Sequence, residues 1–300
     1  VIDSVWLVKP TIQSQEPIEI MARIHNYGQN NAVSSKLSLQ IDGTQRLAKS
    51  INIPAGSYKD ISISFVNKQS GWIGGELSVT DIPIVFDNTY YFSVLINPSI
   101  KVLELGKQSD EFLKIFSKDS IFDFTHSTEE ELDYSSLSSF DYIILNQLSK
   151  ISSGLSNQLK KFVFDGGILS VIPNGKSSML TPLFNELGVP NYQSLANKQI
   201  SISPLSIQGS FYEGAYKRIP SNLFLPQIQS CYGLNSGPKS DKVLYLKDGS
   251  EILSKTDIGS GSVFQFTVPF DSNLNYVASE LFVITQLKIA FSRRNTQTIA

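Results

Sequence analysis

The segment FDYIILNQLSKISSGLSNQLKKFVFDGGILSVI, residues 140–172, decides the fold of the second part of the chain. Its apolar run at 140–145 predicts a buried strand, and the apolar residues that follow at helical spacing are Leu155, Leu159, Phe162 and Val163. Gly166 and Gly167 predict the end of this helix, because glycine readily adopts the left-handed conformation that ends many helices. A second apolar run occupies 168–172. Two strands joined by a helix through short loops predict neighbouring parallel strands.

The same alternation extends toward the N-terminus. Apolar runs at 100–105 and 121–124 predict two more strands, and Ser109 is expected to open a helix between them that carries Phe112, Ile115 and Phe116. Ser127 with Glu130 fits a capping box, which predicts a further helix start.

Toward the C-terminus the pattern is mixed from Gln199 onward. Strands are expected at 243–246, 252–255 and 263–268, and a final helix carries Val277, Leu281, Ile284 and Phe291 on one face. We therefore expect residues 99–300 to form an α/β domain of the flavodoxin-like kind, with a parallel sheet covered by helices on both sides.

The first hundred residues alternate with period two instead. The apolar runs lie at 5–8, 18–24, 37–41, 51–53, 61–66, 76–79 and 91–96. Turn signals separate them at 26–28, 42–43, 54–56, 74–75 and 87–88. About seven short strands at this spacing predict an all-β immunoglobulin-like sandwich for residues 1–98, and a domain boundary near Asn97 and Pro98.

Composition narrows the function classes. The chain has 300 residues, 25 Lys and Arg against 27 Asp and Glu, and a net charge of −2, so it is not built to neutralise many phosphates and nucleic acid is not expected as a partner. Its one cysteine excludes an internal disulfide and an all-cysteine metal site. The apolar runs are too short to span a bilayer.

Two family resemblances rest on these motifs. The first part resembles the bacterial CARDB immunoglobulin-like family, through Asn26-Tyr27-Gly28 after a strand, Pro54-Ala55-Gly56 before a strand, and Asp87-Asn88 before the last one. The second part resembles the class I glutamine amidotransferase-like fold, through the segment 140–172.

The tandem, with residues 219–226 downstream, is similar to the extracytoplasmic region of BatA-type aerotolerance-related membrane proteins of Bacteroidetes. The resemblance implies a periplasmic location and a membrane anchor outside this chain.

An active amidotransferase of this fold needs a cysteine nucleophile on the turn after a strand, with a histidine base in reach. Here the turn after 168–172 reads Pro173-Asn174-Gly175-Lys176-Ser177-Ser178, without a cysteine. Cys231 is interpreted as a packed small hydrophobe. The chain contains no Gly-x-Ser-x-Gly elbow either. We therefore predict that the chain is not an enzyme.

Two further motifs are interpreted as structural. Residues 170–177 resemble a phosphate-binding loop, but Ser170 stands where its first glycine belongs, and 171–172 fit a strand, which leaves too short a loop. Residues 129–131 are three consecutive glutamates, whose side chains would fan around a helix instead of converging on a metal ion. No cofactor and no metal is expected.

The aromatic residues leave two interpretations open. Those singled out are Trp72, Tyr90, Tyr91, Phe211, Tyr212 and Tyr216. They could form a sugar-binding or protein-binding surface, although aromatic residues in strands more often pack in a core or pair across strands.

The resulting hypothesis is a non-catalytic, extracytoplasmic interaction or scaffold region with protein partners in the cell envelope. Ligands of open α/β sheets gather beyond the carboxyl ends of the strands, so binding is expected at the loops 106–109, 125–127, 146–149 and 173–176. Asn174 and Lys176 are the predicted contacts for an anionic group, against the alternative of a solvated turn. The other hypotheses are a hydrolase using His126 with Ser127 or Asp123, and a carbohydrate-binding module.

Overall fold

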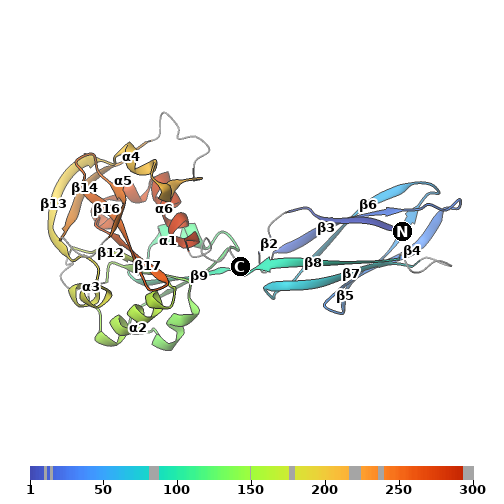
Figure 1. Cartoon of the computed structure of the whole chain (residues 1–300), viewed down its shortest axis with the longest axis horizontal. Coiled ribbons are helices and arrows are strands. Elements are labelled where there is room, and N and C mark those ends of the chain that lie inside the picture. Colours follow the sequence, from blue (N-terminus) through green and yellow to red (C-terminus); the bar gives the residue numbers. More distant parts are fainter. Residues whose placement is uncertain are drawn as a thin grey trace. The chain divides into compact units, whose positions relative to one another are not determined.

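A computed structural model describes residues 1–9, 12–13, 16–80, 88–148, 150–175, 180–215, 224–235 and 240–292. The chain is mostly β, and its internal contacts divide it into two compact units, Val1–Ser99 and Ile100–Ala300 (Figure 1). In the described part of the chain, no helix has the length and apolar character needed to cross a bilayer.

The first unit contains two sheets. One has the order β1-β3-β6, and the other the order β2-β8-β7-β4-β5. Their strands are β1 (Ile2–Leu7), β2 (Ile12–Gln13), β3 (Pro17–His25), β4 (Ala32–Ile41), β5 (Thr44–Ile53), β6 (Tyr58–Val66), β7 (Gly71–Val79) and β8 (Thr89–Asn97). Neighbouring strands run antiparallel except for β2 and β8, which are parallel.

Alternate residues of these strands build the core of the first unit. Along β3 the buried side chains are Ile18, Ile20, Ala22 and Ile24, the face that the period of two predicts. They belong to one apolar cluster with residues of both sheets, including Leu37, Leu39, Leu77 and Ile96.

The predicted turn at Gly74 and Gly75 is wrong, because both glycines lie inside β7. Gly75 faces the core directly opposite Phe92 of β8, and a Cβ atom there would lie 2.1 Å from the Cζ atom of the Phe92 ring. The ring therefore occupies the space that a side chain would fill. Gly74 faces outward, where the nearest atom to an added Cβ would be Asp42 Oδ1 at 3.6 Å.

The second unit is organised around a seven-stranded sheet with the order β10-β9-β11-β12-β17-β16-β15. The strands are β9 (Ile100–Gly106), β10 (Phe122–Ser127), β11 (Tyr142–Asn146), β12 (Ile168–Ile172), β15 (Asp241–Tyr245), β16 (Glu251–Ile258) and β17 (Gly261–Phe266). The first five in this order are parallel, as expected, but β16 and β15 are antiparallel, so the sheet is mixed. Tight turns at Gly249 and Gly259 join these last strands, and a tight turn can only connect antiparallel neighbours.

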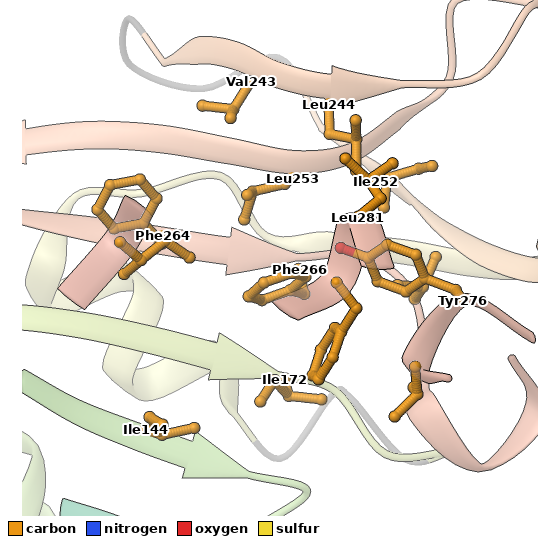
Figure 2. Close-up of a cluster of buried hydrophobic side chains, with 14 of the residues drawn as sticks. Ile144, Ile172, Val243, Leu244, Ile252, Leu253, Phe264, Phe266, Tyr276 and Leu281 are labelled. Atoms are coloured by element: carbon orange, nitrogen blue, oxygen red, sulfur yellow. The ribbon is translucent and has the colours of Figure 1, made fainter. Parts of the chain in front are cut away.

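Both faces of this sheet are covered. Helices α2 (Ser153–Phe164) and α3 (Thr181–Leu187) pack on one face, against Leu105, Leu145 and Val171. The other face carries α1 (Asp110–Phe116), α4 (Pro204–Ile207), α5 (Leu274–Val277) and α6 (Glu280–Phe291) (Figure 1). Figure 2 shows this second core, where Phe266 of β17 lies near Tyr276 and Leu281.

Two parts of the second unit differ from the sequence-based expectation. No helix begins at Ser127, which ends β10, and its Oγ donates to the Thr128 carbonyl (3.2 Å) instead of capping a helix. In the loop that follows, Glu129 Oε1 accepts hydrogen bonds from the Ser152 amide (3.0 Å) and the Tyr134 hydroxyl (3.1 Å). A 3₁₀ turn at Tyr134–Ser139 follows. The two-stranded antiparallel ribbon of β13 (Tyr192–Ser201) and β14 (Gln227–Leu234) was not expected.

The two adjacent glycines of β7 give a matched test of the sandwich packing. Gly75→Ala should lower the free energy of unfolding of the first unit by about 1–3 kcal/mol, because the Phe92 ring must leave its place. Gly74→Ala should leave it unchanged or raise it by up to about 1 kcal/mol, because glycine is unfavourable in a strand. Tryptophan fluorescence in urea follows this unit alone, since both tryptophans, Trp6 and Trp72, lie in it. Equal stabilities for the two variants would contradict the packing argument.

Candidate functional site

The candidate site lies at the carboxyl ends of the parallel strands. Numbered along the chain, the parallel strands follow the order 2-1-3-4-5. The chain runs from β9 outward to β10, then crosses back past β9 to β11 and continues in the opposite direction along the sheet. In doubly wound sheets a crevice opens at such a reversal. Here a cleft of about 460 Å³ is lined by loop residues after four strands, among them Lys107, Glu130, Lys150 and Asn174.

A buried carboxylate lies at the end of β9, next to this cleft. Glu104 is fully buried, and Asn146 Nδ2 donates hydrogen bonds to Glu104 Oε1 (2.8 Å) and to the Lys107 carbonyl (2.7 Å). Burial raises the pKa of Glu104, while the hydrogen bonds from Asn146 and the Ser109 amide and the charge of His126 act in the opposite direction. The Asn146 Oδ1 atom is buried, and no described residue forms a hydrogen bond with it.

Gly106 brings the loops after β9 and β11 into close contact. Its φ of +113° favours glycine, and a Cβ atom there would lie 2.5 Å from the Asn146 carbonyl oxygen. The Lys107 amide donates to that carbonyl (2.9 Å), and His126 Nε2 lies 3.1 Å from the Gly106 carbonyl. The close contact at Gly106 and these two hydrogen bonds therefore fix the backbone of the loops after β9 and β11.

An ion pair bridges the carboxyl edge above these contacts. Lys107 Nζ lies 2.6 Å from Asp271 Oδ1, and Gln147 Nε2 donates to the same oxygen at 3.4 Å. The hydrogen bond from Lys107 lowers the pKa of Asp271. Both charged side chains are more than half exposed (53% and 61%), so the pair contributes at most about 1 kcal/mol. Gln147 also has a left-handed backbone, with φ of 54°, at the end of β11.

Of the two predicted contacts, Asn174 lines the cleft and Lys176 lies outside the described residues. Asn174 Nδ2 donates to the carbonyls of Leu148 (2.8 Å) and Gln147 (3.4 Å). The Asn174 amide is thus directed at the loop after β11 in this structure, and its role toward an anionic group stays a prediction.

Among the described residues, no hydrogen bond joins the residues weighed for catalysis to one another. Cys231 is in β14, 2% exposed, and burial raises the pKa of its thiol, which disfavours the nucleophilic thiolate. In the described part of the chain, no hydrogen bond joins His126 to Ser127 or Asp123, and Ser127 Oγ donates to the Thr128 carbonyl (3.2 Å). The described residues contain no group of three or more side chains able to hold a metal ion.

The aromatic candidates separate into exposed and buried ones. Trp72 and Tyr91 are 72% and 73% exposed, whereas Tyr90 packs against the core of the first unit. Phe211 packs against the core of the second unit, and Tyr212 is buried, with its hydroxyl 2.9 Å from Thr285 Oγ1. Tyr216 lies outside the described residues.

Replacing the buried carboxyl group tests the electrostatics of this edge. Because the pKa of Glu104 is raised in the folded state, the folded protein binds a proton at this carboxyl more tightly than the unfolded one, and ionisation costs stability as the pH rises above 4.5. Glu104→Gln keeps an oxygen for Asn146 and should melt at a higher temperature than the wild type near neutral pH. The difference should shrink as the pH falls toward 4.5, as followed by calorimetry.

The matched control is Glu130→Gln, at an exposed glutamate of the same edge. This control should show no such pH-dependent difference from the wild type. A Glu104→Gln variant that melts below the wild type at neutral pH, with an unchanged pH profile, would contradict the argument.

No family model and no curated protein matches this sequence. Among solved structures, the chain is similar to a cytoplasmic protein from Salmonella typhimurium LT2, at 11% identity and a TM-score of 0.50, over 75% of this chain and 96% of that one. It is also similar to the CARDB domain of a Pyrococcus furiosus protein, at 19% identity and a TM-score of 0.28, over 31% of this chain and 92% of that one. At these identities the likenesses concern the fold alone.

Proposed function

We propose that this chain is a non-catalytic interaction or scaffold region of a cell-envelope protein, made of an immunoglobulin-like sandwich and a flavodoxin-like, amidotransferase-like domain. The sequence resemblances support the two domain assignments. The 2-1-3-4-5 order of the parallel strands supports the second one, because that order is typical of flavodoxin-like sheets. The extracytoplasmic location and the membrane anchor outside this chain belong to the same proposal.

The observation that carries the proposal is the set of hydrogen bonds and ion pairs that the polar side chains at the carboxyl edge form within the protein. Glu104 is held by Asn146, Lys107 by Asp271, and the Asn174 amide by backbone carbonyls. None of these three contacts pairs a nucleophile with a general base, which is the arrangement that covalent catalysis needs. The single cysteine supports the same conclusion, because it lies in β14 and not on the turn after β12.

The cleft itself supports a binding role. Its volume of about 460 Å³ is within the range of about 300–1,000 Å³ that ligand sites occupy. Lys150 and Glu130 line it with exposed charged side chains that make no hydrogen bond or ion pair with the described residues. A cation and an anion that line the same cleft would complement a protein loop that carries both charges.

Chemical inertness is the first test of this proposal. The chain should release no ammonia from glutamine beyond a heat-denatured sample. Iodoacetamide should label Cys231 only after unfolding, because the thiol is buried and its pKa is raised. Cys231→Ser serves as the labelling control. Stoichiometric labelling of the folded chain together with turnover would overturn the proposal.

Charge reversal in the cleft is the second test. A protein partner captured from a cell-envelope extract of the organism of origin should bind a Lys150→Glu, Glu130→Lys double variant at least about fivefold more weakly, because both contacts become repulsive. Lys118→Glu, at an exposed lysine outside the cleft, is the matched control and should bind as the wild type does. Unchanged binding by the folded double variant would place the interface elsewhere.

A further inference from the structure

The outer face of the five-stranded sheet carries two aromatic rings whose faces are free. Trp72 of β7 and Tyr91 of β8 are 72% and 73% exposed. Among the described residues, no other ring or cation stacks on either of them. A binding surface needs such free faces, because a ring that is already stacked has its face occupied.

The exposed aromatic residues of the other sheet form the contrast. The Arg23 guanidinium lies 4.4 Å from the centroid of the Tyr58 ring and 5.9 Å from that of Trp6. The His25 ring stacks on Tyr27, with centroids 3.8 Å apart. Each of these rings therefore has a face in contact with a cation or another ring of the protein. The outer faces of the two sheets both carry exposed rings, but only Trp72 and Tyr91 have ring faces without such a contact among the described residues.

The register of β7 and β8 places the two free rings on one strip. Its cross-strand pairs are Trp72 with Leu95, Gly74 with Ser93, and Glu76 with Tyr91. All six residues face outward, because alternate residues share a face. The two rings stand about 13 Å apart along the strands, at about 3.3 Å per residue. Gly74 and Ser93, which are small and exposed, form a shallow floor between them.

Gly74 has no structural reason to be a glycine. Gly75 next to it must leave room for the Phe92 ring, but a side chain at Gly74 would meet only Asp42 Oδ1, at an ordinary 3.6 Å. Its backbone is not in the left-handed region either. A glycine inside a strand costs about 0.5–1 kcal/mol relative to alanine. A glycine inside a strand often marks a place where a ligand or another backbone approaches closely, and the open space at Gly74 allows such an approach.

The chemistry of the strip selects the ligand class. Its six residues include one charged side chain, the carboxylate Glu76, and no cation. A second carboxylate lies beside the floor, because Asp42 Oδ1 accepts a hydrogen bond from the Gly74 amide (2.8 Å). An anionic ligand would be repelled there. Sugar hydroxyls donate to carboxylates, and the C–H groups of a sugar ring pack on aromatic faces.

We infer that this strip, Trp72 to Tyr91 across Gly74, binds a neutral polysaccharide chain. Two rings separated by a flat floor suit an oligosaccharide stretch that contacts both. The inference concerns a face of the first unit and does not depend on the cleft of the second unit.

Affinity electrophoresis of the whole chain in native gels tests the inference. The probes are laminarin, hydroxyethylcellulose, galactomannan and amylopectin. At least one of them should retard the wild type. Trp72→Ala and Tyr91→Ala should each weaken the retardation by about tenfold, the loss of one aromatic platform. Gly74→Thr should abolish it without lowering the melting temperature, because threonine suits a strand and only fills the floor. Trp6→Ala, on the other sheet, is the matched control and should behave as the wild type.

Fluorescence gives an independent readout. The chain has two tryptophans, so Trp6→Phe leaves Trp72 as the only one. With excitation at a wavelength that tyrosine does not absorb, the retarding polysaccharide should shift the Trp72 emission to shorter wavelength. Three results would each overturn the inference: no retardation by any of the four probes, retardation of the Gly74→Thr and Trp72→Ala variants equal to the wild type, or a concentration-dependent dimer in sedimentation that Trp72→Ala abolishes. The last result would assign the strip to a contact between copies of this chain.

Discussion

The hydrogen bonds of Asn146 hold together the carboxyl edge on which the candidate cleft depends. Its amide joins the buried Glu104 at the end of β9 to the backbone of Lys107, which begins the cleft wall. A hydrogen bond to a charged group contributes about 1.5–3 kcal/mol, and its loss would leave a buried carboxylate without its best donor. The strand order reverses between β9 and β11, and a crevice opens there. The hydrogen bond from Asn146 to Glu104 joins the ends of these two strands.

The first unit obeys a different constraint, which is the space between facing strands. Phe92 covers Gly75 on the inner face, while Gly74 leaves the outer face bare. Packing against Phe92 explains why residue 75 is a glycine. No such neighbour explains Gly74, and the proposed ligand binding would account for it. The stacked row of Arg23, Tyr58 and Trp6 on the other sheet shows how exposed rings are stabilised when they serve the fold alone.

Sequence periodicity predicted the helices and strands that bury one face, such as β3 and α2, and the strands that are buried on both faces, such as β11 and β12. The alternation at 18–24 and the pattern of 140–172 correspond to β3, β11, α2 and β12, because burial there is regular. The ribbon strand β13 escaped prediction since most of its side chains are exposed, so no apolar period marks it. The sequence pattern at Gly74 and Gly75 predicted a turn, because adjacent glycines are common in turns. That Gly75 lies in a strand depends on Phe92 of β8, which the sequence pattern does not place opposite it.

The candidate site was predictable in place but not in detail. Parallel strands imply that their carboxyl ends meet, and the loops after β9, β10, β11 and β12 do line one cleft. The Glu104–Asn146 pair was missed although the sequence carries its signal, a glutamate inside the apolar run 100–105. A charged residue there requires a buried partner, but its identity depends on the register between β9 and β11, which pairs Gly106 with Asn146.

The two surfaces of this protein differ in chemistry, and that difference constrains what each can bind. The cleft of the second unit is lined by a free cation and a free anion among the described residues, and salt weakens their attraction for a charged partner. The strip of the first unit offers ring faces, and the carboxylates of Glu76 and Asp42 can accept hydrogen bonds from sugar hydroxyls. The strip contains no cation, so the binding of a neutral sugar should depend little on ionic strength. A ligand that suits one surface lacks the groups that the other would recognise. The two proposals therefore name two different partners, a charged protein loop for the cleft and a neutral polysaccharide for the strip, and a scaffold role requires partners that differ in this way.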